Sequence, residues 1–170
     1  MVGTLQDAID NLSIHDVYLR SSSAMLAENF EPRYDTELEN LKVQFKHIVT
    51  HSNVLELEEP EGNTTNLFRV FVELGTRWVL HARESDEEDV KAHIEGVMVA
   101  EYQMYQNPGK DALKEFALKN ASYHIWPFWR EYLSSQCLRM NLPKLVLPVK
   151  QFASNPVADS APSATPSKFD

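Results

Sequence analysis

The sequence predicts an α+β fold in which a four-stranded antiparallel sheet, connected as a meander, packs with a short helix and a longer C-terminal helix. Four segments between residues 14 and 102 have the branched and aromatic composition of strands. The connections at 58–63 and 84–89 are short and acidic and contain no helical crossover, which indicates antiparallel pairing. After residue 109 the apolar spacing changes from two to three and four, which indicates helices.

The strands are expected at residues 14–20, 41–50, 67–79 and 90–102. The second alternates apolar with polar residues, as a strand with one wet face does. The third has one fully apolar face and one that is only half polar, so something should cover part of the second face. In the fourth, small and apolar residues again share a face.

The helices are expected at residues 111–119 and 122–141, with Pro127 in the first turn of the longer one, where a missing amide proton does little harm. Residues 142–152 contain two prolines and should form an extended, irregular arm. The Ser/Ala/Pro-rich tail, 153–170, is expected to be disordered, and residues 1–13 to be a flexible N-terminus. The folded domain is therefore expected to span 14–152.

Composition excludes several functions. The chain has 170 residues, 43% of them hydrophobic, and a net charge of −9, which opposes binding to nucleic acid. Five glycines form no phosphate-binding loop, and no run of eighteen apolar residues could cross a membrane. Without a leader-like N-terminus, the cytoplasm is the expected location. The single cysteine, Cys137, cannot close an intrachain disulfide and is expected to be a buried apolar residue.

No motif predicts catalysis, a cofactor or a metal. There is no nucleophile elbow and no metalloprotease motif, so an enzyme is not expected. His47 and His51 are four residues apart, but on a strand such residues share a face about 13 Å apart, too far for one metal ion.

Five aromatic residues within ten positions are more than one helix face can bury beneath itself; they are Tyr123, Trp126, Phe128, Trp129 and Tyr132. Either they form an ordinary core together with an oligomer interface, or they line an apolar groove between helix and sheet. The two interpretations are compatible, and both stay open.

Two C-terminal motifs carry a family resemblance. Trp126-Pro127-Phe128-Trp129-Arg130-Glu131 and Leu142-Pro143-Lys144-Leu145-Val146-Leu147-Pro148 follow four strands at a separation that resembles the SecB export chaperones. The Ser/Ala/Pro tail, together with Lys91 and His93 in the fourth strand, departs from the acidic features that family members offer to the SecA motor. The chain is therefore more similar to the SecB-like chaperones found beside toxin–antitoxin pairs, whose client groove holds an antitoxin extension.

The resemblance implies an ATP-independent holdase that keeps unfolded or slow-folding polypeptides competent for export or handover. Its partners would be unfolded preproteins or an antitoxin, with SecA as a further one, and the assembly a homotetramer built as a dimer of dimers. Arg130 and Glu131 are expected to be structural and not catalytic, pairing within a subunit or between subunits. The residues expected in the client groove or a subunit interface are Val43, Phe45, Phe68, Val70, Val72, Trp126, Phe128, Trp129, Tyr132, Leu145 and Leu147. The rival hypothesis is a small-molecule or lipid binding protein that encloses a cavity between the same elements.

Overall fold

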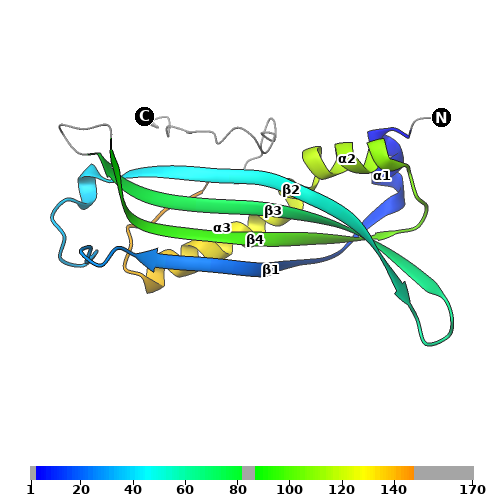
Figure 1. Cartoon of the computed structure of the whole chain (residues 1–170), viewed down its shortest axis with the longest axis horizontal. Helices are drawn as coiled ribbons and strands as arrows, with labels where there is room; N and C mark the ends of the chain where they lie inside the picture. The colour runs from blue at the N-terminus through cyan, green and yellow to red at the C-terminus, as the bar shows by residue number, and fades with distance from the viewer. Residues whose placement is uncertain (1–2, 82–86, 148–170) are drawn as a thin grey trace.

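The computed structural model of the chain describes residues 3–81 and 87–147. Its elements are α1 (Leu5–Asn11), β1 (Leu12–Leu26), the 3-10 helix η1 (Leu38–Asn40), β2 (Lys42–Glu58), β3 (Thr64–His81), β4 (Glu88–Met104), α2 (Lys110–Lys119) and α3 (Ala121–Arg139) (Figure 1). The predicted class, four antiparallel strands with a short and a longer helix, is confirmed. Residues 148–152 of the expected arm and the expected disordered tail at 153–170 lie outside the described residues.

The strand order is β1-β4-β3-β2, so the predicted four-strand meander is wrong at β1. Strands β2, β3 and β4 do form a meander, but β1 pairs antiparallel with β4, from Leu12 opposite Met104 to Leu26 opposite Ala92. Residues 27–41 carry the chain from β1 at one edge of the sheet to β2 at the other (Figure 1). Alternation within a strand shows which residues share a face, but not which strand lies next to it. The sequence therefore did not reveal that β1 pairs with β4.

All four strands are longer than predicted, because backbone pairing extends beyond the apolar alternation. Strand β1 continues through three exposed serines, Ser21, Ser22 and Ser23, which pair with Val97, Gly96 and Glu95. Polar side chains at a sheet edge still leave the ladder hydrogen bonds intact.

The N-terminus contains a helix, which corrects the expectation of a flexible segment at 1–13. The amide of Thr4 donates to Asp7 Oδ2 over 2.7 Å, and the amide of Asp7 donates to Thr4 Oγ1 over 3.3 Å, a capping box that satisfies two amides of the first turn. Ala8 is fully buried, and α1 contacts α2. Capping and packing together order a segment that is polar by composition.

The hydrophobic core lies between one face of the sheet and α2 and α3 (Figure 1). Gly96 on β4 is what lets Trp129 pack closely there. A Cβ at Gly96 would lie 3.1 Å from Leu19 Cδ1, 3.2 Å from the Ser21 carbonyl oxygen and 3.4 Å from Trp129 Cζ3. The indole, only 1% exposed, therefore rests on the strand backbone itself.

Pro127 is the seventh residue of α3, which corrects its predicted place in the first turn. The helix begins at Ala121, directly after the end of α2, because the aromatic segment packs on the core from its first residue. Proline cannot donate to the carbonyl four residues earlier, and neighbouring packing offsets that loss.

The opposite face of the sheet mixes polar side chains with buried apolar ones, such as Phe71 and its cross-strand partner Val99. His51 stacks on the Phe71 ring with centroids 4.1 Å apart, and the guanidinium carbons of Arg69 and Arg20 lie 5.5 and 5.9 Å from its centroid. The half-polar face predicted for the third strand is therefore covered by side chains of neighbouring strands. Lys46 pairs with Glu73 on the same face.

Candidate functional site

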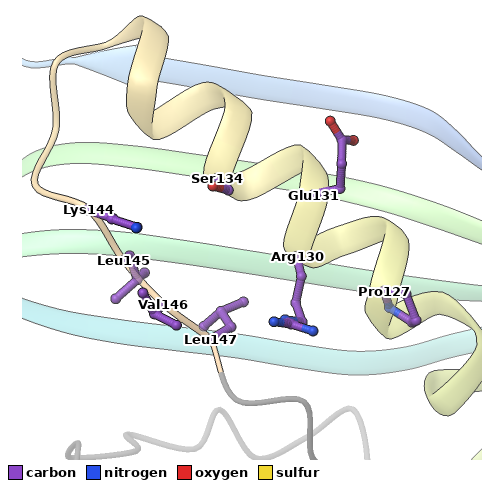
Figure 2. A pocket seen from close by; sticks show the side chains of 8 residues that line it. All are labelled: Pro127, Arg130, Glu131, Ser134, Lys144, Leu145, Val146 and Leu147. Carbon is purple, nitrogen blue, oxygen red and sulfur yellow. The ribbon is translucent and has the colours of Figure 1, made fainter.

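A short extended segment, here called the arm (residues 142–147), runs beside α3 across the sheet (Figure 2). Asn141, with φ 55°, ends the helix in a left-handed residue. The amide of Leu142 then donates to the Cys137 carbonyl over 3.0 Å, closing a Schellman motif that reverses the chain. Pro143 prevents renewed helix, so the arm stays extended as predicted.

Side chains of the arm alternate between the core and solvent. Leu142 and Leu147 are buried and Leu145 is half-buried against the core, whereas Val146 is 72% exposed. The arm is thus held at both ends while its middle remains accessible.

Two adjoining cavities, with volumes of about 400 and 570 Å³, lie between α3 and the arm. They share Glu131, Ser134, Lys144 and Leu145, so we treat them as one feature, the α3–arm groove. The groove is lined by Pro127, Arg130, Glu131, Ser134, Ser135, Cys137, Leu138, Leu142, Lys144, Leu145, Val146 and Leu147. Figure 2 shows one of the two cavities, with Arg130 directed toward the arm and Glu131 away from it.

The groove is open and largely apolar at one end. Leu138 is 81% exposed there, next to the less accessible Leu142 and Leu145. An exposed leucine beside leucines that already pack on the core forms an apolar surface on which the apolar side chains of a ligand can pack. Its open shape suits an extended polypeptide better than an enclosed small molecule.

The sequence-predicted site residues divide into four groups, the last of which lies in the core. Leu145 and Leu147 line the groove. Four others are half-buried and pack on the core; these are Val43, Phe45, Trp126 and Tyr132. The remaining aromatic of the α3 motif, Phe128, is 47% exposed.

Four predicted site residues lie in the core and not at the surface. Phe68, Val70 and Val72 of β3 point toward α2 and α3 and are 2%, 0% and 0% exposed. Trp129 is buried against Gly96. Helices α2 and α3 cover this face of β3, so these side chains cannot reach a client or a second subunit in this conformation.

A second exposed apolar area lies near edge strand β1. Ile14 and Leu19 are 52% and 36% exposed and stand opposite Tyr102 and Met98, so they share the sheet face that carries α3. Helix α3, which also contacts β1, carries a further exposed aromatic residue, Phe128.

Sequence reasoning missed the polar and helical part of the groove. Pro127, Glu131, Ser134 and Leu138 recur at three- and four-residue steps and therefore share the outer side of α3. That spacing can be read from the sequence, but it indicates a groove only if the arm is known to lie beside α3. Arg130 and Glu131 were expected to pair structurally; neither forms an ion pair with another described residue.

The buried titratable groups of the described chain are structural. His47 Nε2 lies 2.7 Å from Ser122 Oγ, and Tyr102 Oη lies 2.8 Å from His124 Nδ1. Burial lowers the pKa of His47 to about 4 and also lowers that of His124. These contacts join the sheet to α3, away from the groove.

The strand histidines do not share a face, in contrast to the expectation for residues four apart. A register irregularity between Val49 and His51 turns His51 to the polar face while His47 faces the core. Within residues 3–81 and 87–147, no three His, Cys, Asp or Glu side chains are grouped as metal ligands would be.

Comparison with known proteins shows a similarity of fold. No protein-family model matches the chain, and no curated protein matches its sequence. Among solved structures it is similar to the Mycobacterium tuberculosis Rv1957 SecB-like chaperone in complex with a ChAD peptide from the Rv1956 HigA1 antitoxin. The two share 17% sequence identity over 89% of this chain and 97% of that one, with a TM-score of 0.58.

At that identity the similarity concerns the fold. The four-stranded sheet and C-terminal helices have the arrangement of a SecB-like chaperone. A search of the described helices finds none long and apolar enough to cross a membrane.

Proposed function

We propose that the chain is a SecB-like chaperone that holds unfolded polypeptide segments in the α3–arm groove without using ATP. The observation that carries this proposal is the open groove itself, in which the exposed Leu138 adjoins Leu142 and Leu145. The solved neighbour of the same fold is a chaperone with a bound peptide, which supports a polypeptide as the ligand.

The energy for such binding can come from apolar burial alone. At about 25 cal/mol per Å², two anchors that bury about 300 Å² contribute about 7 kcal/mol before the cost of ordering the segment. This is enough for reversible capture, so no nucleotide and no catalytic group is required.

We propose a homotetramer, a dimer of dimers, as the assembled form. Strand β1 is an edge of the sheet, and exposed edges are sites where a second chain can pair. Ile14 and Leu19 add exposed apolar area on that side. A second copy would cover both features.

The natural client would be an antitoxin or an unfolded preprotein that the chaperone keeps competent for handover in the cytoplasm. An antitoxin segment is favoured by the peptide in the neighbouring structure. The sheet face opposite α3 mixes Arg69, Arg77 and Lys46 with its carboxylates, which disfavours coupling to SecA through that face.

The test combines light scattering after size exclusion with suppression of aggregation of a reduced, unfolded test protein. Leu138→Asp places a charge in the groove at a side chain that is 81% exposed, so the fold should survive. Leu57→Asp is the matched control, because Leu57 is also exposed but lies on β2 near the hairpin, outside the groove.

Wild-type protein and Leu57→Asp should both form tetramers and delay aggregation, and Leu138→Asp should form tetramers but delay it much less. If the wild-type protein is a monomer that does not affect aggregation, the chaperone proposal is wrong and a small-ligand site becomes the better explanation of the cavities. If Leu138→Asp protects as well as the wild type does, the chaperone uses another surface.

A further inference from the structure

The α3–arm groove carries two cations that the described structure leaves without a carboxylate. Arg130 is partly buried and Lys144 is exposed, and both line the cavity shown in Figure 2. Within residues 3–81 and 87–147, no carboxylate oxygen lies within 4 Å of the charged nitrogens of either side chain. The remaining charged group of the lining, Glu131, points away from the arm (Figure 2).

This local charge is opposite to that of the whole chain. Residues 121–147 contain three basic side chains, Arg130, Arg139 and Lys144, and one acidic side chain, Glu131, whereas the full sequence has a net charge of −9. A partly buried cation that has no partner gains from a carboxylate brought by a ligand. Arginine offers that carboxylate two parallel hydrogen bonds.

We propose that the α3–arm groove selects polypeptide segments in which an aspartate or glutamate side chain lies among apolar residues. The apolar residues occupy the surface made by Leu138, Leu142 and Leu145, and the carboxylate lies between Arg130 and Lys144. The long-range field of the acidic protein favours basic chains, so the groove adds a short-range preference of opposite sign. This inference rests on the proposed function, because it concerns which segments the groove holds.

The probe is a nine-residue, fluorescein-labelled peptide, Gly-Ser-Leu-Phe-X-Phe-Leu-Ser-Gly, with X as Glu, Gln or Lys. Both ends are blocked so that the X side chain is the only group whose charge varies. Binding to the full chain is measured by fluorescence anisotropy at low and high salt. The Glu peptide should bind about 2- to 10-fold more tightly than the Gln peptide at low salt, the range for two partly exposed ion pairs, and the Lys peptide most weakly. Added salt should reduce the differences.

The double variant Arg130→Gln/Lys144→Gln should bind the Gln peptide as the wild type does and lose the preference for Glu. The matched control is Lys114→Gln/Arg139→Gln, which makes the same change in net charge at residues that do not line the groove. It should keep the preference, which separates a local contact from the field of the whole protein. Lys144→Gln alone should reduce the preference. Because Lys144 is exposed, this single variant should fold normally and provides the test if the double variant misfolds.

Each outcome decides a different question. If no peptide binds, the proposed function fails and this inference fails with it. If the peptides bind but Glu and Gln peptides bind equally at low salt, the groove holds polypeptide without a carboxylate preference and the inference alone is overturned. The same holds if the two double variants lose the preference equally.

Discussion

Acidification should destabilise this protein through His47, a histidine that the fold buries as a neutral group. His47 is 8% exposed on the core face of β2, with Nε2 2.7 Å from Ser122 Oγ of α3. Burial lowers its pKa from 6.5 to about 4. Below pH 6.5 the unfolded chain therefore binds a proton that the folded chain does not, so the free energy of unfolding falls as the pH falls, until about pH 4.

The size of the effect follows from the two pKa values. The difference between 6.5 and about 4, at about 1.4 kcal/mol per pH unit, gives about 3 kcal/mol in all, of which about 2 kcal/mol is lost by pH 5. The lowered pKa of His124 acts in the same direction. Such a loss is a large fraction of the stability of an ordinary domain.

The assay is urea unfolding, followed by circular dichroism at one protein concentration, at pH 7.5, 6 and 5. His47→Gln should lower the free energy of unfolding at pH 7.5, since the buried contact with Ser122 changes, but it should lose about 2 kcal/mol less than the wild type between pH 7.5 and 5. His51→Gln, on the same strand but exposed on the opposite face, should follow the wild-type pH dependence. If His47→Gln and the wild type lose the same free energy between these pH values, the protonation argument is refuted.

Two further predictions concern the packing of α3. Gly96→Ala should lower the free energy of unfolding by about 1–3 kcal/mol, because its Cβ would lie 3.2 Å from the Ser21 carbonyl oxygen, a backbone atom that cannot turn aside. Gly75→Ala should cost less, because its closest neighbour is the flexible Glu95 side chain at 3.2 Å. Equal losses in urea unfolding would contradict this close-approach argument. Burial raises the pKa of Cys137 to about 11. At pH 8 a thiol reagent should therefore react with the folded chain far more slowly than with the chain unfolded in urea. Fast stoichiometric labelling of the folded protein would contradict the packing of α3 on the sheet.

Periodicity predicted the elements well where one face is buried and one is wet. The alternation in β2, β3 and β4 located those strands, and the three- and four-residue spacing after residue 109 located α2 and α3. The strands were predicted too short, because the backbone hydrogen bonds between strands continue through polar edge residues such as Ser22. Helix α1 was missed because its stability depends on the Thr4–Asp7 capping box and on burial of Ala8 more than on any apolar stripe.

The candidate site could be predicted only in part. Leu145 and Leu147 were expected in it because they belong to the second motif that resembles the SecB family. Phe68 and Val70 were expected there too, but an apolar strand face has the same sequence signature whether its own helices or another chain covers it. The groove exists because α3 and the arm lie side by side. The left-handed conformation of Asn141 reverses the chain and so places the arm beside the helix.

The sequence by itself determined the fold class, the element types and the presence of more aromatic surface than one helix can bury, since these follow from local periodicity and composition. The tertiary structure alone decided that β1 pairs with β4, which apolar residues are interior, and that Arg130 and Lys144 meet in one groove. The physical reason is range: alternation and capping act over a few residues, whereas strand order and the pairing of α3 with the arm depend on contacts between residues distant along the chain.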